Sequence, residues 1–203
     1  MTQSAAQAPG PSLFGVVLPD RLTLAAFIVF IVVSGGASVA IRFTYAELPP
    51  FWGAAARFGL GAAIFYTWAA VRRIPLPRGR ALVGAVLFGV FSMGLAFTFI
   101  YWGLVKTPAS LYQTLVALVP LLTLFFAYFH QLEPFRLRGV LGALLTVVGI
   151  TVAVGGAAAD DLPALRIVAI IAGAACLAEA GVIAKVYPRS HPVATNAVAM
   201  TVG

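Results

Sequence analysis

The chain has 203 residues, of which 62% are hydrophobic and 9% charged, whereas an ordinary soluble domain is about 45–50% apolar and about 25% charged. This composition, with a mean hydropathy of +1.02, excludes a water-soluble globule, because so much apolar surface must face lipid. The net charge of +7 does not indicate nucleic-acid binding, since the cations lie mostly between hydrophobic runs, where they orient helices.

Apolar runs in chain order predict an all-α polytopic membrane protein. The runs are continuous and about 20 residues long, the length that a helix needs to cross a bilayer, whereas barrel strands would alternate apolar and polar residues. We expect six full spans and the start of a seventh, at residues 22–41, 51–71, 81–104, 110–130, 137–154, 165–186 and 192–203. Residues 1–20 are polar and are expected to form a disordered cytoplasmic tail.

The connections between the spans differ in charge. Nine cations lie on one side of the membrane, in the end of the N-terminal tail and in the second, fourth and sixth connections between spans. The connections on the other side hold three: Arg42, Lys106 and Arg166. The positive-inside rule then places the N-terminus in the cytoplasm.

Two landmarks indicate an internal repeat. The first span ends VAIR and the sixth ends VIAK, and the same offset of 143 residues separates Arg42 from Lys185 and Pro49 from Pro192. Five spans lie between equivalent points, so the second unit runs through the membrane in the opposite sense. Inverted repeats of this kind are the usual construction of secondary transporters, with the substrate site near the midplane.

Two stretches resemble a known family. The stretch SGGASVAIRFTYAELPPFWGAAARFGLGA is similar to the first two spans of the EamA-like transporters of the drug/metabolite transporter superfamily, with Arg57 and Phe58 as their Arg-Phe pair. The stretch LVKTPASLYQTLVALVPLLTLFFAYFHQLEPFRLRGVLGALLTVVGI resembles their fourth and fifth spans, through a set of matching positions: Thr107, Ala109, Pro120, Thr123, Leu132, Glu133 and Gly139.

The resemblance implies an inverted-repeat bundle of ten spans that exports small metabolites or drugs across the inner membrane by alternating access. Residues 21–156 would form the first five-helix repeat and residues 164–203 an incomplete second repeat, so we expect the chain to be truncated and inactive as a fragment. Translocation of a lipid carrier and a non-transporting structural subunit remain alternatives. The expected partners are the bilayer, a small-molecule substrate with or without proton coupling and, as an option, a second copy of the chain.

Glu179 is the most informative position, because an acid near the middle of the sixth span costs a few kcal/mol unless it is buried, paired or protonated. Its i−3 and i−4 neighbours are Cys176 and Ala175, so it borders a row of small residues and is expected to point into the bundle. Glu179 is therefore a candidate for proton coupling or cation binding. A protonated structural acid bonded to a neighbouring helix is the alternative.

Five further residues are candidates for substrate binding. Arg57 lies inside the second span, where it either snorkels to the headgroups or forms a fixed cation in an outward-facing vestibule. Tyr101, Trp102, Tyr112 and Gln113 flank the connection between the third and fourth spans. Aromatic residues there belong either to the interfacial belt or, as phenol and amide groups facing a cavity, to a site for a polar substrate.

Small residues spaced four apart predict the faces on which helices pack in lipid. The second span has such a row at Ala55, Gly59 and Ala63. Enzyme, metal-ligand and phosphate-binding motifs are not found in the sequence. We therefore expect no catalytic residue, no metal and no cofactor.

Overall fold

The computed structural model describes residues 12–13, 16–17, 21–44, 50–132 and 164–203, with isolated positions between 139 and 152. The chain forms two compact units, Met1–Ile41 and Arg42–Gly203. In the first unit the short strands β1 (Ser12–Leu13) and β2 (Val16–Val17) pair antiparallel. The rest of the N-terminal tail lies outside the described residues, so its expected disorder stays a prediction.

The first unit also contains most of α1 (Arg21–Thr44), a helix of 24 residues. All described side chains from Leu22 to Gly36 are exposed, and nearly all of them are apolar. Such a helix needs an apolar environment on every side, as expected of a membrane span.

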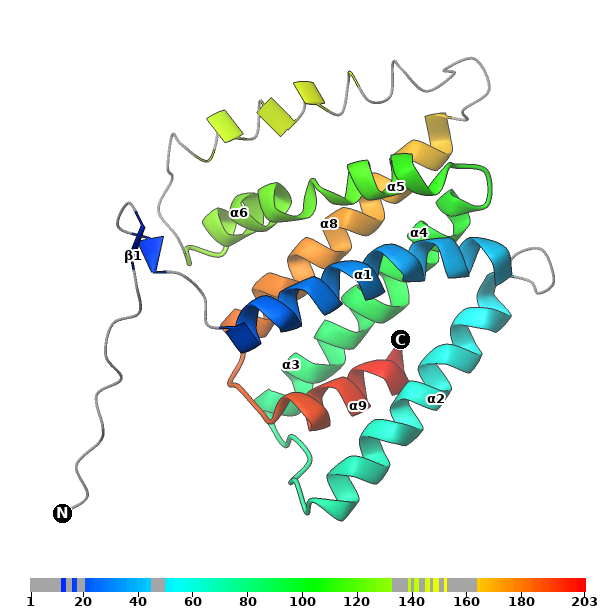
Figure 1. Ribbon diagram of the computed structural model, residues 1–203. Helices are drawn as coiled ribbons and strands as arrows, with labels where there is room; N and C mark the ends of the chain where they lie inside the picture. Colours follow the sequence, from blue (N-terminus) through cyan, green and yellow to red (C-terminus); the bar gives the residue numbers. More distant parts are fainter. Residues whose placement is uncertain are drawn as a thin grey trace. The chain divides into compact units, whose positions relative to one another are not determined.

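The second unit is helical throughout its described residues (Figure 1). Its elements are α2 (Pro50–Val71), α3 (Arg80–Gly89), η1 (Val90–Leu95), α4 (Ala96–Leu104), α5 (Ala109–Val116), α6 (Val119–Phe129), α8 (Ala164–Val186) and α9 (Pro192–Val202). The predicted polytopic helical membrane protein is confirmed by this architecture.

Four stretches are long and apolar enough to cross a membrane: Phe51–Val71, Arg80–Leu104, Ser110–Phe129 and Ala164–Val186. This number is lower than the six full spans predicted. The first predicted span coincides with α1, of which the described apolar stretch Leu22–Gly36 is shorter. The fifth, at residues 137–154, falls largely outside the described residues.

The third predicted span contains a π-helical segment that the sequence pattern does not reveal. Between α3 and α4 the chain forms η1, and the Ala96 amide bonds to the Phe91 carbonyl, five residues back. Ser92 donates its hydroxyl to the Phe88 carbonyl at 2.5 Å and is buried. The Ser92 hydroxyl thus competes with backbone amides for the Phe88 carbonyl at the place where the helix widens. π-Helical turns of this kind frequently occur at functional sites.

The fourth predicted span is interrupted where Pro120 lies. Helix α5 ends at Val116 and α6 begins at Val119, with a turn at residues 117–118 and Pro120 in the first turn of α6. Proline has no amide hydrogen to continue the ladder to the carbonyl four residues earlier, which explains the break.

Helix α8 lies at the centre of the second unit and packs against α3, α4, α5 and α6 (Figure 1). A β-carbon on Gly173 of α8 would lie 2.9 Å from the Ala96 carbonyl oxygen, and one on Gly103 of α4 would lie 2.5 Å from the Ile170 side chain. The two backbones therefore approach as closely as glycine allows.

Helix α9 packs against α2 and α3. On α3 a β-carbon at Gly89 would lie 2.6 Å from Ala199 Cα, so this crossing also depends on glycine. The small-residue row predicted on α2 makes no close packing contact with the described helices of the second unit. Gly59 has no atom within 4 Å of its missing β-carbon, and Ala55 and Ala63 are exposed. Phe58 and Ala62 form the buried face instead.

Candidate functional site

A cation and three aromatic rings meet where α2 lies beside α4. The Arg57 guanidinium lies 5.0 Å from the centre of the Phe58 ring, 5.3 Å from that of Phe97 and 5.6 Å from that of Tyr101. The rings also contact one another, Phe58 with Phe97 at 5.2 Å and Phe97 with Tyr101 at 5.6 Å. Each of the three distances from the guanidinium to a ring centre is within the range of a cation–π contact, about 6 Å. Within the described residues the cation thus lies against ring faces, because the one acid described there, Glu179, pairs with His130.

Tyr112 of α5 extends this cluster. Its phenol is close enough to Tyr101 and Arg57 for their charges to act on it, although Tyr112 lies on a different helix from either and packs against the core around Leu115 and Ile170. Tyr101 is almost fully buried, at 2% exposure, and Tyr112 is half-buried. We call Arg57, Phe58, Phe97, Tyr101 and Tyr112 the Arg57 cluster. Three of the six predicted site residues, Arg57, Tyr101 and Tyr112, come together in it. Gln113, the next residue of α5, is half-buried.

A cavity of about 470 Å³ lies between α2, η1, α4 and α9 and shares the three rings of the cluster. Its other walls are small or apolar and include Ala54, Ala55, Gly59, Met93 and Met200. Its polar lining comes from Thr98 and Thr201. Thr201 donates its hydroxyl to the Ala197 carbonyl at 2.8 Å, so the Tyr66 hydroxyl, 3.4 Å from the Thr201 oxygen, is the donor of the contact between those two side chains. Apolar walls with a few polar groups are typical of small-molecule sites, and this volume is within their usual range of about 300–1,000 Å³.

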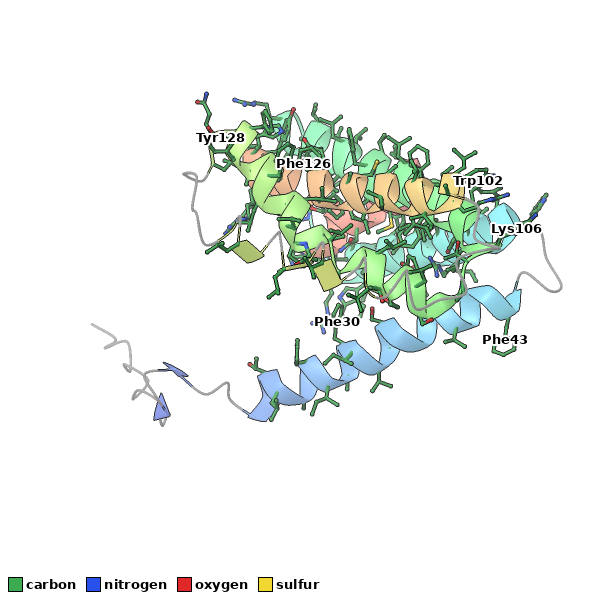
Figure 2. The ribbon with its side chains drawn as sticks, turned by 90° about the horizontal axis from the view of Figure 1, so that it is seen from above. Phe30, Phe43, Trp102, Lys106, Phe126 and Tyr128 are labelled. Carbon is green, nitrogen blue, oxygen red and sulfur yellow. The ribbon has the colours of Figure 1, made fainter. Side chains whose placement is uncertain are left out.

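Trp102 lies apart from the cluster, although it follows Tyr101 in sequence. Arg166 of α8 stacks on the Trp102 ring at 3.7 Å and donates from Nη1 to the Trp102 carbonyl. Figure 2 shows Trp102 and Lys106 at one end of the helical unit and Tyr128 at the other. With 37% of its surface exposed, Trp102 has the position of an interfacial aromatic residue.

Glu179 is bound by a histidine of another helix. Its Oε1 lies 2.8 Å from Nε2 of His130, which directly follows α6. The Glu179 side chain is 17% exposed and the His130 side chain 40%. This pair involves neither the Arg57 cluster nor the 470 Å³ cavity, so the six predicted residues form at least two separate groups.

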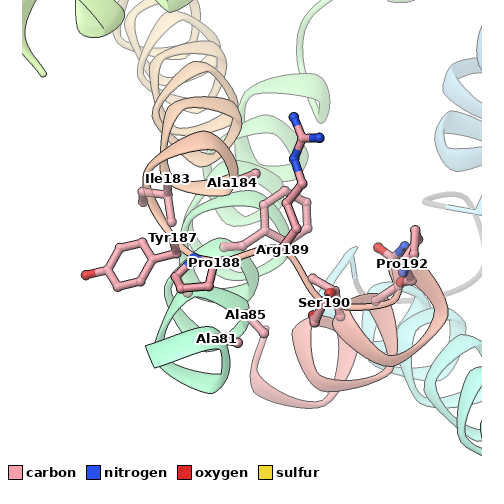
Figure 3. A pocket seen from close by; sticks show the side chains of 13 residues that line it. Ala81, Ala85, Ile183, Ala184, Tyr187, Pro188, Arg189, Ser190 and Pro192 are labelled. Carbon is pink, nitrogen blue, oxygen red and sulfur yellow. Dashed lines mark hydrogen bonds between the residues drawn. The ribbon is translucent and has the colours of Figure 1, made fainter. Parts of the chain in front are cut away.

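A second cavity, of about 270 Å³, lies where α3 begins and α8 is joined to α9 (Figure 3). Ala81 and Ala85 of α3 line it together with Ile183 and Ala184 of α8, and Arg189 belongs to the connection that closes it. The connection that contains Arg189 therefore lies beside the start of α3, which the basic connection at residues 72–79 directly precedes. No group of three or more potential metal ligands occurs within the described ranges.

One comparison with known proteins gives a match. The family model described as "EamA-like transporter family" matches residues 21–155, which is more than half of the chain. The chain belongs to the EamA-like transporter family. No curated protein and no solved structure matches it.

Membership makes this EamA-like protein a membrane transporter of small molecules. The Arg57 cluster lies wholly within the matched residues, whereas the Glu179–His130 and Arg166–Trp102 contacts each join a matched residue to α8, which follows the matched region. Within the described residues, α8 of the transporter is therefore bound to the matched region by a polar contact in its first turn, through Arg166, and by another about two turns before its end, through Glu179.

Some residues of these groups were not among the sequence candidates. Phe97 stands four residues before Tyr101 on α4, so helical spacing could have placed both on one face. His130 ends an apolar run and is one of two histidines in the chain, which is a usable signal. No pattern in the sequence connects Arg166 to Trp102, because 64 residues separate them and only helix packing brings them together.

Proposed function

We propose that the protein is a secondary transporter that exports small metabolites or drugs across the inner membrane by alternating access. The observation that carries this proposal is the Arg57 cluster beside the 470 Å³ cavity. The Arg57 side chain is exposed, although it lies within the candidate span Phe51–Val71, where a charged side chain is costly unless it faces a cavity or another group. Among the described residues it lies against ring faces, which neutralise its charge less fully than a carboxylate would. Such a cation keeps attraction for an anionic or electron-rich group of a substrate.

The helix bounds support a two-repeat construction. Adding the offset of 143 residues between VAIR and VIAK to Arg21, where α1 begins, gives residue 164, where α8 begins. The following helices, α2 and α9, begin at Pro50 and Pro192, one residue from the same offset, and these two helices pack against each other. Contact between equivalent helices is expected where two inverted repeats meet.

The charges support an orientation with the N-terminus in the cytoplasm. The connection that contains Arg189 lines the 270 Å³ cavity beside the start of α3, and the basic connection at residues 72–79 directly precedes α3. Lys106 follows the end of α4, and Arg166 stands at the start of α8. The end with more cations faces the cytoplasm. On this orientation the Arg57 cluster lies nearer the outer face.

Glu179 is the group that we propose for coupling. It is an acid inside the span Ala164–Val186 and is largely shielded, with 17% of its side chain exposed. A carboxylate in such a place can bind a proton or another cation and release it when its surroundings change. The pair with His130 also agrees with a structural role, so the test of coupling must separate the two.

The experiment is flux through the full-length protein in lipid vesicles. Strains that lack or overproduce the protein are first compared for resistance and secreted metabolites, and the compound that differs is then used as the transported probe. Wild type should accumulate the probe, and Arg57→Gln should reduce its uptake by about tenfold or more. Arg78→Gln, in the exposed connection before α3, is the matched control and should transport normally.

The alternatives give different outcomes. A structural subunit would show no flux of any probe, and a lipid-carrier translocase would move a labelled lipid carrier but not a water-soluble metabolite. Equal flux by wild type and Arg57→Gln would leave the protein a transporter but would remove the Arg57 cluster from its substrate path.

A further inference from the structure

His130 is placed by the way in which α6 ends. After His130, Gln131 has a positive φ of 56°, its amide bonds to the Tyr128 carbonyl at 3.0 Å, and the Leu132 amide bonds to the Ala127 carbonyl at 2.9 Å. These two bonds are those of a Schellman motif, in which the residue of positive φ is usually glycine. Gln131 adopts this conformation without being glycine, so tertiary structure holds the helix end and the His130 ring in place.

His130 stands at the C-terminal end of α6. The last carbonyls of a helix carry partial negative charge, which stabilises a cation there. Glu179 contributes a carboxyl group at 2.8 Å. When His130 is protonated and Glu179 ionised, the pair is neutral overall, and the bond between its members is charge-assisted.

The surroundings of Glu179 contain few other titratable groups. The helices that pack against α8 carry Arg80 on α3, Tyr101 on α4, Tyr112 on α5 and Tyr128 on α6, and η1 carries none; α8 itself carries Arg166, Cys176 and Lys185. Of the basic groups within the described residues, the His130 ring is the one within salt-bridge distance of the Glu179 carboxylate.

We propose that His130 is the positioning partner of Glu179 and that their contact is a reversible bond between α6 and α8, which weakens when Glu179 takes up a proton or another cation. This inference rests on the function proposed above. Helix α6 belongs to the residues that match the family and α8 follows them, so the bond joins the first proposed repeat to the second. Figure 1 shows α6 and α8 side by side.

The mechanism follows from competition for one carboxylate. A proton or other cation that neutralises Glu179 removes the negative charge that His130 binds, and an ion pair then becomes a weaker contact between the charged ring and a neutral group. Binding of a cation to Glu179 and attachment of α6 to α8 through His130 then oppose each other. A local charge change thereby biases a movement between the repeats, as a coupled transporter requires.

The test measures separation of α6 from α8 directly. Ala127 is 2% exposed and precedes His130 by three residues, so both lie on one face of the chain there. Because Cys176 is the single cysteine, Cys176→Ala gives a cysteine-free background. Ala127→Cys is then labelled with N-ethylmaleimide in the full-length protein in liposomes, with Ala69→Cys, at a position 4% exposed on α2, as the control site.

We expect labelling at Ala127→Cys to become about fivefold faster with Glu179→Gln, which imitates the protonated acid, and with His130→Leu. The double variant should be no faster than the faster single variant, because both changes remove the same bond. His130→Gln retains an N–H donor for the carboxylate and should restore slow labelling. The control site should not respond to any of these changes.

Other results would overturn the inference. Unchanged labelling in Glu179→Gln and His130→Leu, independent multiplication of the two effects, or equal acceleration at Ala69→Cys would each show that the pair does not hold α6 to α8. Vesicle flux is measured on the same variants. Loss of coupled flux with unchanged labelling would overturn the role of His130 and leave the transport proposal standing, whereas the expected labelling in a protein without flux would leave the bond and remove the transport proposal.

Discussion

The guanidinium of Arg166 lies 3.7 Å from the centre of the Trp102 ring and at the same time donates to the Trp102 carbonyl. That carbonyl is in the last turn of α4, where carbonyl groups have no partner within the helix. Arg166 stands in the first turn of α8. One side chain thus caps one helix and fixes the start of another.

Arg166→Ala should therefore destabilise the protein. The loss of one cation–π contact and one charged hydrogen bond is expected to lower the free energy of unfolding by about 1–3 kcal/mol. Arg166→Lys should recover only part of this, because an ammonium group lacks the planar face that stacks on the indole. Thermal unfolding in detergent measures both, and Lys106→Ala, an exposed cation at the same end, should change it by less than about 0.5 kcal/mol.

Two glycines of α8 should respond in opposite directions to alanine. A β-carbon at Gly173 would lie 2.8 Å from the Ile100 side chain and 2.9 Å from the Ala96 carbonyl oxygen, whereas one at Gly181 would meet nothing within 4 Å. Gly173→Ala should cost about 1–3 kcal/mol of stability through overpacking against backbone. Gly181→Ala should gain up to about 1 kcal/mol from helix propensity. A stabilising Gly173→Ala would show that α4 and α8 are not in close backbone contact.

Hydropathy was sufficient to locate most helices, because a membrane requires about 20 apolar residues in a row wherever a helix crosses. The expected spans at 51–71 and 165–186 begin one residue after α2 and α8 begin. They end on the same residues as these helices. The break at Pro120 follows from the chemistry of proline. The π-helical segment η1 was not predicted, because the bond from the Ser92 hydroxyl to the carbonyl four residues back also occurs in ordinary α-helix, as it does for Thr67 in α2.

The candidate site could be predicted only residue by residue. Arg57, Tyr101 and Glu179 stand out because polar groups are rare in apolar helices. Their partners depend on which helix faces lie together: Arg57 has aromatic rings where the sequence left a choice between headgroups and a vestibule, and Glu179 has a histidine 49 residues away. The row Ala55, Gly59 and Ala63 makes no close contact within the second unit, since four-residue spacing identifies a face but not what that face meets.

The proposed orientation predicts the reactivity of single cysteines in intact cells. In the Cys176→Ala background, Arg78→Cys should be protected from an impermeant maleimide and Lys106→Cys should be labelled, because the positive-inside rule places residues 72–80 in the cytoplasm. Permeabilised cells should label both. Labelling of Arg78→Cys in intact cells, with protection of Lys106→Cys, would invert the topology.

Glu179→Gln separates coupling from structure. If Glu179 carries the coupling proton, it alternates between protonated and ion- or substrate-bound states, and an amide cannot follow this cycle. Accumulation driven by a pH gradient should then be lost, whereas exchange of substrate across the membrane, which needs no net proton movement, should continue. If Glu179 stays protonated throughout, an amide is nearly its isostere, and both activities should persist.

The measurement is pH-gradient-driven uptake and substrate exchange in the same vesicles, for wild type, Glu179→Gln and Asp160→Asn. Asp160 lies in a connection that we expect outside the membrane, so its amide is the matched control for loss of one acid. Lower exchange together with lower uptake in Glu179→Gln would indicate damage to folding or to the substrate path, and His130→Gln then shows whether the pair is responsible. Unchanged gradient dependence in Glu179→Gln would remove this acid from coupling, because no proton cycle could pass through a group that does not titrate.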